Sequence, residues 1–165
     1  MRSQPTNKPA LLLVAVAILA LTACLGCNPR HAASAAFHAI DVDSGWNSQM
    51  PLVFTPAYGD SDKCYDITLV VRHTNQYAYA NLSLTVDLLA DTALAPRRRN
   101  VVFSLADSAG NWQGAGFGAL YQVKTTIARQ VSPRDTRRVA VWQTMADVAT
   151  VRQIADVGII VTPSY

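Results

Sequence analysis

Two segments of the chain alternate apolar and polar residues, and this period of two restricts the fold more than any other feature of the sequence. A helix would scatter such residues around its surface, whereas a β-strand places them on opposite faces. The alternation therefore predicts strands over residues 65–71 and 79–88, each with one face in a core. The predicted core faces carry Tyr65, Ile67, Leu69 and Val71 in the first strand and Leu82, Leu84, Val86 and Leu88 in the second.

The amino-acid composition supports a β-rich chain. All 11 acidic residues are aspartates, so glutamate, a strong helix former, is absent from the 165 residues. Half of the residues are hydrophobic, which excludes a disordered chain and fits one globular domain. A helical bundle is therefore disfavoured, and strands must supply the fold.

Further short apolar or β-branched runs, separated by Gly, Asn, Asp and Pro, extend the strand pattern toward the C-terminus. We expect an all-β domain over residues 41–165, an antiparallel β-sandwich with one short helical turn near the C-terminus at 148–154. Neither an internal repeat nor a second domain is evident. The additional strands are expected at residues 51–55, 101–105, 116–128, 137–145 and 157–161.

The N-terminus has the features of a secretory signal peptide. Arg2 and Lys8 give a positive start, and residues 10–23 then contain no charged residue. As a helix this run would extend about 21 Å, less than the hydrocarbon core of about 30 Å. We therefore expect residues 1–23 to be a lipoprotein signal peptide and not a spanning helix.

The end of this segment predicts a lipid anchor. Leu21, Thr22, Ala23 and Cys24 resemble the lipobox of bacterial lipoproteins, in which the Cys thiol receives a diacylglyceryl group and the chain is cut just before it. Cys27 is a poorer acceptor, because Cys24 stands three residues before it where the motif has a branched apolar residue. Cys24 is the expected lipidation site, and acyl chains such as palmitate would hold the protein on a membrane.

The residues after the expected cleavage site bear on localisation and charge. Leu25, not Asp, follows Cys24, and the first acid is Asp41, so sorting signals of the usual bacterial type favour the outer membrane with the domain facing the periplasm. Loss of residues 1–23 leaves 12 basic residues (14 minus Arg2 and Lys8) against 11 acidic ones, which gives no case for nucleic-acid binding.

The segment between the anchor and the domain is polar and rich in small residues. We expect residues 24–40 to be a lipid-anchored tether, either a flexible leash or, from about residue 25, an edge segment of the domain. Cys27 lies in this tether and Cys64 in the domain, and a disulfide between them in an oxidising compartment is left open.

Motifs for catalysis or cofactor binding are weak. Gly114, Gly116 and Ala119 match the G-x-G-x-x-A spacing of dinucleotide-binding loops, but a β-branched run follows them instead of a helix, so close packing at a strand start explains them better. The three histidines have no zinc-ligand spacing, although His73 could form a triad with Ser83 or Ser104 on paper. We expect no enzyme activity, no metal site and no cofactor.

Contacts with a partner are the more promising function for the polar surface. Arg97, Arg98 and Arg99 form a basic cluster, expected on a loop, that is either a solvated turn or a contact for an acidic partner or anionic lipid. Trp112 lies in a polar, glycine-containing loop and is expected to be exposed as a contact residue. Trp46 and Trp142 are expected in the core.

Local patterns along nearly the whole mature chain resemble the gliding-motility lipoprotein H family of Bacteroidetes, and the stretch from Asp107 to Gly116 (D-x-x-G-x-W-x-G-x-G) is the most specific of them. The other pieces are the lipobox, Trp46 before Pro51 and Phe54, residues 65–69 with Arg72, Tyr79-x-Asn81-Leu82-x-Leu84, Gln143-x-Met145 and Ile154-x-Asp156-Val157-Gly158-Ile159.

This resemblance implies a non-enzymatic accessory lipoprotein of the gliding machinery and of the associated envelope secretion machinery, whose proteins would be its partners. It implies no catalytic residue, because none is known for the family. An alternative from the residues alone is a periplasmic lipoprotein that binds glycan or cell wall through exposed aromatic rings.

Overall fold

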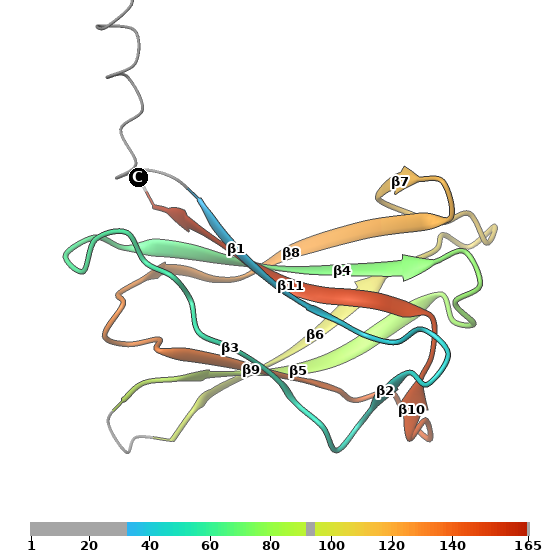
Figure 1. The fold of residues 1–165 in the computed structure, drawn as a ribbon, viewed down its shortest axis with the longest axis horizontal. Helices are drawn as coiled ribbons and strands as arrows, with labels where there is room; N and C mark the ends of the chain where they lie inside the picture. The colour runs from blue at the N-terminus through green and yellow to red at the C-terminus, as the bar shows by residue number, and fades with distance from the viewer. Residues whose placement is uncertain (1–32, 92–94, 165) are drawn as a thin grey trace, which may run out of the picture. The chain divides into compact units, whose positions relative to one another are not determined.

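The computed structural model describes residues 33–91 and 95–164, and within them every regular element is a β-strand (Figure 1). The predicted signal peptide, Cys24 and Cys27 lie outside these residues. The strands in chain order are β1 (Ser34–Ala39), β2 (Trp46–Asn47), β3 (Leu52–Phe54), β4 (Tyr65–Thr74), β5 (Asn81–Leu89), β6 (Arg97–Ser104), β7 (Ala115–Phe117), β8 (Leu120–Val131), β9 (Arg138–Gln143), β10 (Thr150–Val151) and β11 (Ile154–Pro163).

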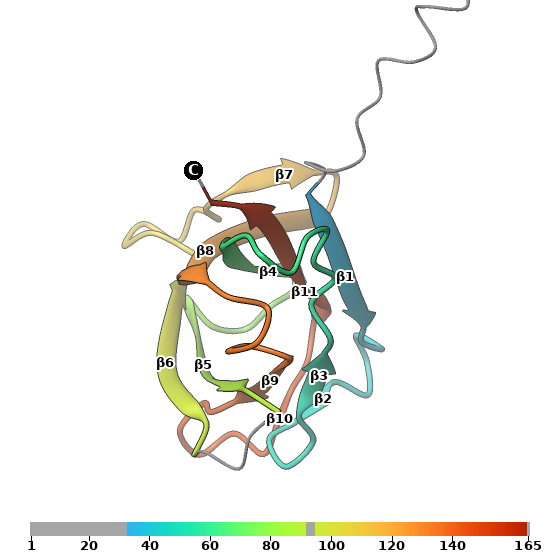
Figure 2. The same cartoon turned by 90° about the vertical axis from the view of Figure 1, so that its left-hand side faces the viewer.

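The strands form two facing antiparallel sheets, which confirms the predicted all-β sandwich. One sheet has the order β1-β11-β4-β8-β7 and the other has the order β3-β9-β5-β6. Figure 2 looks along the strands and shows the two sheets as separate layers, with β1 and β3 at one side and β6 and β8 at the other. The short ribbon of β2 and β10 lies at one end of the sandwich (Figure 1).

The core lies between the sheets and uses the two predicted alternating strands. Every second residue of β4 and β5 is fully or almost fully buried, and β9 and β11 supply the facing rows. Burial of each Leu, Ile or Val contributes about 1.5–3 kcal/mol, so these four strands provide most of the stabilisation. The buried residues of these rows are Tyr65, Ile67, Leu69, Val71, Leu82, Leu84, Val86, Leu88, Val139, Val141, Val157, Ile159 and Val161.

The sandwich begins earlier than residue 41. Ser34–Ala39, inside the expected tether, forms β1 and pairs along its full length with β11. Of the two alternatives for this segment, a flexible leash or an edge segment, residues 34–39 are therefore the edge segment. Ser34 Oγ and His38 Nε2 also donate hydrogen bonds to the carbonyls of Ala57 (2.6 Å) and Val53 (2.9 Å).

The short helical turn expected at residues 148–154 is wrong. Thr150–Val151 forms β10, which pairs with Trp46 and Asn47 of β2. The β-branched Thr150 and Val151 favour a strand once a partner strand is available, and a sequence window cannot show that partner. Gln143 fixes the loop between β9 and β10, since its side-chain amide donates to the carbonyls of Val148 (3.0 Å) and Ala149 (3.2 Å).

The sandwich is closed on one side and open on the other. Segment 53–57 covers the outer edge of β1 through the two side-chain hydrogen bonds of Ser34 and His38. On the opposite side, β6 and β8 belong to different sheets and form no ladder with each other. This open side carries the predicted arginine cluster and is the place to look for a site.

Candidate functional site

The arginine cluster lies on a strand, so its expected position on a loop is wrong. Arg97, Arg98 and Arg99 begin β6 and pair in register with residues 88, 87 and 86 of β5. The pairing gives the three side chains different surroundings, because neighbouring residues of a strand point to opposite faces. Arg98 lies on the outer face of its sheet, whereas Arg97 and Arg99 lie on the face that carries the core.

Arg98 is held in place by Asp87. Its Nε and Nη2 donate to the two carboxylate oxygens of Asp87 at 2.8 and 2.7 Å, a two-pronged ion pair. The Asp87 side chain is only 5% exposed, so the pair satisfies a buried carboxylate. The bond also raises the pKa of Arg98. Arg98 is therefore a structural residue more than a contact residue.

Arg97 and Arg99 are more available than Arg98 for contact with a partner, because neither forms an ion pair with a described carboxylate. Arg97 Nη2 donates to Thr136 Oγ1 at 3.1 Å, and Thr136 is buried two residues before β9 begins. Tyr58 also binds this residue, since its hydroxyl donates to the Thr136 carbonyl. Burial raises the pKa of the Tyr58 hydroxyl to about 12. Arg99 is exposed and forms neither a salt bridge nor a side-chain hydrogen bond within residues 33–91 and 95–164. Two guanidinium groups thus project beside the open side.

Trp112 is half-buried, so the expectation of an exposed contact ring is only partly met. Its ring packs edge-on against His73 (centroids 4.8 Å apart) and near Tyr121 (6.1 Å) and Tyr77 (6.5 Å). A flat sugar-stacking platform needs a free aromatic face, and this ring instead closes the end of the core. The backbone around it is fixed, since Ala106 and Trp112 form a β-bridge.

His73 is the centre of that aromatic cluster. It is fully buried, its Nδ1 bonds the Thr74 carbonyl at 2.9 Å, and its Nε2 has no hydrogen-bond partner among the described residues. Neither Ser83 nor Ser104 forms a hydrogen bond with His73, so the Ser-His pair of the possible catalytic triad does not form. Burial lowers the His73 pKa, an effect that the bond to Thr74 partly opposes.

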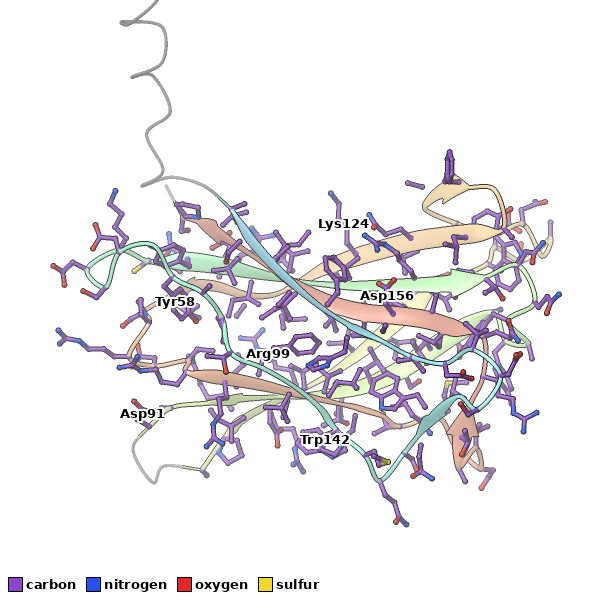
Figure 3. All side chains as sticks on the ribbon, viewed as in Figure 1. Tyr58, Asp91, Arg99, Lys124, Trp142 and Asp156 are labelled. Carbon is purple, nitrogen blue, oxygen red and sulfur yellow. The ribbon has the colours of Figure 1, made fainter. Side chains whose placement is uncertain are left out.

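The remaining tryptophans lie in different surroundings. Trp46 is buried in the core as expected, and its Nε1 donates to the Met50 carbonyl at 2.8 Å. Trp142 is half-buried on the outer face of β9, so its expected place in the core is wrong. Figure 3 shows Trp142 and Lys124 on the two opposite outer faces of the sandwich, as alternation in β9 and β8 requires.

The glycine motif at 114–119 forms a β-hairpin of β7 and β8, and within it Gly114 shows the close packing that the sequence predicts. A Cβ on Gly114, which has φ +89°, would lie 2.1 Å from the Gln122 carbonyl oxygen of β8. Only glycine therefore fits at this position. The hairpin of β7 and β8 exposes Phe117 at its tip (91%), a contact candidate that the sequence analysis missed although it stands between two glycines.

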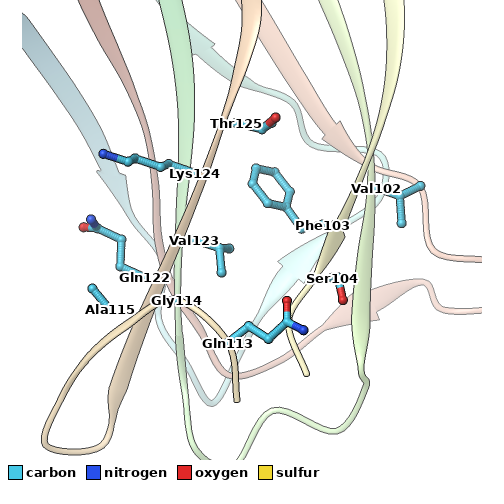
Figure 4. Close-up of a pocket in the computed structure, with 10 residues that line it drawn as sticks. All are labelled: Val102, Phe103, Ser104, Gln113, Gly114, Ala115, Gln122, Val123, Lys124 and Thr125. Atoms are coloured by element: carbon cyan, nitrogen blue, oxygen red, sulfur yellow. The ribbon is translucent and has the colours of Figure 1, made fainter. Parts of the chain in front are cut away.

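A groove of about 490 Å³ runs along the open side (Figure 4). Its walls are residues 102–104 of β6 and 122–125 of β8, and residues 113–115 close one end. Phe103, Val123 and Gln113 point into the space between the two strands, and Lys124 points to the other side of β8. The groove is therefore a mixed apolar and polar channel between strands of different sheets.

The described residues hold no group of three or more His, Cys, Asp or Glu side chains placed to bind a metal ion. In the same part of the chain no helix has the length and hydrophobicity to cross a membrane. Cys64 is exposed and forms no disulfide with a described residue.

The fold and this surface define a small antiparallel β-sandwich whose candidate site consists of strand edges, arginines and an aromatic hairpin. The model of one family, described as GldH lipoprotein, matches residues 36–161, from β1 to β11. The chain therefore belongs to the GldH lipoprotein family, which confirms the resemblance found in the sequence. It is thus a lipoprotein of the cell envelope from a family associated with gliding motility, anchored to a membrane.

Comparison with solved structures finds viral coat proteins. The Tobacco streak virus coat protein shares 9% identity at a TM-score of 0.33, with 81% of this chain and 88% of that chain covered. Turnip yellow mosaic virus gives 9% identity and a TM-score of 0.35, with 81% and 80% covered. Both TM-scores are too low to support any statement about function. No curated protein matches the sequence significantly.

Proposed function

We propose that this protein is a non-enzymatic outer-membrane lipoprotein that serves as an accessory or scaffold component of the gliding-motility and associated secretion machinery. The observation that carries the proposal is the family match, which covers nearly the whole sandwich and not one motif. The partners would be envelope proteins of that machinery, and the domain would face the periplasm. The contact candidates are Arg97, Arg99 and the hairpin tip at Phe117.

The lipid would supply the attachment to the membrane. Acylation of Cys24 with three chains would anchor the protein stably, because one chain gives marginal binding and two or more do not release readily. Residues 25–33 would then link the lipid to β1, so the domain would stay within a short distance of the bilayer. This arrangement suits a protein that positions another protein at a membrane.

The roles of the aspartates support the non-enzymatic part of the proposal. Asp87 pairs with Arg98 and Asp156 with Arg72, so both carboxylates hold strands together. Asp41 accepts a hydrogen bond from the Ser44 backbone N–H, and Asp107 accepts hydrogen bonds from the side-chain amide and the backbone N–H of Asn111. These bonds lower both pKa values. Carboxylates used in this way organise turns and ladders, and none of these four is paired with a second carboxylate for acid–base work.

A deletion strain tests the proposal. We expect loss of surface spreading or of adhesin secretion, restored by the wild-type gene and not by the Cys24→Ala variant. Normal spreading and normal secretion in the deletion strain would contradict the proposed role. Replacement of each aspartate in turn serves as the test for an enzyme, because a turnover that depends on one carboxylate would refute the non-enzymatic assignment.

A further inference from the structure

The sheets end in edge strands, and β6 is the long, regular one whose outer edge forms no ladder, although β8 of the other sheet lies near part of it. The edge of β1 is covered by the hydrogen bonds of Ser34 and His38 to segment 53–57. Strands β3 and β7 contain three residues each, too few to pair with a long segment. Strand β6 is eight residues long and pairs with β5 without any register shift.

The part of β8 that does not pair with β7 is a second unpaired edge near β6, and this edge is irregular. Its ladder with β4 shifts register twice, and Gln130 has φ +50° with its N–H bonded to the Asp66 carboxylate at 2.9 Å. Bulges of this kind twist an edge away and prevent another strand from pairing with it. The protein therefore protects the β8 edge and leaves the β6 edge regular.

The backbone groups available on β6 follow from the ladder. The Leu105 N–H bonds the Ala80 carbonyl at 2.8 Å in the same register as the strand pairs, and bonded pairs alternate along an antiparallel ladder. The N–H and C=O groups of Arg98, Asn100 and Val102 consequently point away from β5. None of these groups forms a backbone hydrogen bond with a residue of the described chain outside β6.

The charge beside this edge is positive. Arg97 and Arg99 project from β6 without a carboxylate partner among the described residues, while the nearby Asp87 is already neutralised by Arg98. Carboxylates are the groups that arginine binds best, through paired hydrogen bonds. On the opposite face of β6, Val102 is exposed and would contact the aliphatic side chains of an added strand whose carboxylates face Arg97 and Arg99. Phe103 and Val123 line the groove between β6 and β8 (Figure 4).

From these observations we propose that the β6 edge binds an extended acidic segment of a partner protein, which adds to the four-stranded sheet as a further antiparallel or parallel strand. Main-chain hydrogen bonds to Asn100 and Val102 would give affinity, and carboxylates beside Arg97 and Arg99 would give specificity. The inference rests on the proposed function, since it names the kind of partner that such a scaffold would hold. A second copy of this chain is a poor occupant, because its own β6 carries the same three arginines.

A defined peptide tests the binding mode with the full lipidated chain in detergent. The probe is a fluorescent eight-residue peptide of alternating Val and Asp, with matched Val-Lys and alternately N-methylated Val-Asp peptides as controls. We expect the Val-Asp peptide to bind and to slow hydrogen exchange of the β6 amides. N-methylation, which removes the strand-forming N–H groups, should weaken binding at least tenfold without any change to the protein. Equal binding of the methylated or the Lys peptide, or no binding at all, would overturn the proposal.

Two protein variants locate the site. Val102→Pro removes one outward N–H and leaves the ladder to β5 intact, and Val102→Thr is its control. Arg99→Asp reverses a charge, with Arg134→Asp in the loop after β8 as its control. We expect the first member of each pair to lose at least tenfold in affinity for the Val-Asp peptide and its control to lose less than twofold. Unchanged affinity in both Val102→Pro and Arg99→Asp would contradict binding at β6.

The deletion strain separates this inference from the proposed function. If the deletion impairs spreading or secretion but Arg99→Asp and Val102→Pro both restore it fully, strand addition at β6 is wrong and the scaffold role stands. If the deletion has no effect while the peptide binds at β6 as described, the proposed function is wrong and the binding edge stands.

Discussion

The ring of Phe37 in β1 lies over Gly158 in β11, across the ladder that joins the edge strand to its sheet. The two residues are Cα partners, and a Cβ on Gly158 would lie 2.2 Å from Phe37 Cδ1 and 2.8 Å from the Ala36 carbonyl oxygen. The aromatic ring thus fills the space that the glycine leaves. Arg72 stacks on the same ring, with its Cζ 4.6 Å from the centroid, and pairs with Asp156, so one small assembly fixes β1, β11 and β4.

This relationship predicts that Gly158→Ala destabilises the sandwich. The new methyl group would force the ring and the β1 backbone away, at a cost of about 1–3 kcal/mol in the free energy of unfolding. Urea titration followed by tryptophan fluorescence measures the change. Because Ala36 is also close, the double variant with Phe37→Ala should recover only part of the loss. Full stability of the single variant would mean that β1 does not pack in this register.

A second prediction concerns the ion pair of Arg98 and Asp87. Arg98→Ala leaves a buried carboxylate without its charged partner and should lower the free energy of unfolding. Arg99→Ala on the same strand, with no partner to lose, should change it by less than about 0.5 kcal/mol. Thermal and urea unfolding of the two variants side by side would test this, and equal losses would refute the distinction between the two arginines.

A third prediction concerns pH. Burial lowers the His73 pKa in the folded chain below its ordinary value of 6.5, so between these two values the unfolded chain binds a proton that the folded chain excludes. The contribution of His73 to the free energy of unfolding is therefore complete above about pH 7 and falls as the pH is lowered through 6.5 toward the folded-state pKa. Denaturant titrations between pH 7.5 and 5 measure this slope.

The matched variant for this effect is His73→Phe. It keeps an aromatic ring against Trp112 and Tyr121 but has no titrating nitrogen. We expect its stability to fall less steeply between pH 7.5 and 5 than that of the wild type. An identical slope in both proteins would show that the acid sensitivity arises elsewhere.

A fourth prediction concerns the anchor. Cys24→Ala should move the protein from the membrane fraction to the soluble periplasmic fraction, because no acyl chain would remain on it. Cys27→Ala should leave the protein in the membrane fraction. Immunoblots of fractionated cells measure both, and retention of the Cys24→Ala protein in the membrane would contradict lipidation at this residue.

The sequence was informative where a residue's surroundings follow from its neighbours along the chain. The alternation at 65–71 and 79–88 marks the two central strands, because a half-buried strand imposes that period whatever its partner. The second strand begins at Asn81, two residues later than the alternation predicts. The tight glycine spacing at 114–116 indicates close packing for the same local reason. The family pattern could also be identified, since it depends on residue types and order.

Features that depend on partner strands could not be predicted. Residues 150–151 form β10 only because β2 lies beside them, and Arg97 to Arg99 are on a strand because residues 86–88 of β5 hold them in register. Trp112 is half-buried because the ring of His73, which is distant in sequence, packs against it together with Tyr121. The unpaired outer edge of β6 is a property of the whole topology and has no signature within its own eight residues.

The most direct test of the central claim, that this lipoprotein holds a protein of the motility or secretion machinery at the membrane, is affinity purification of the tagged full-length protein from cross-linked envelopes with quantitative mass spectrometry. We predict enrichment of gliding or secretion subunits over an unrelated tagged lipoprotein, and reduced enrichment for Arg99→Asp. Enrichment of polysaccharide without such subunits, or no enrichment above the unrelated lipoprotein, would contradict it.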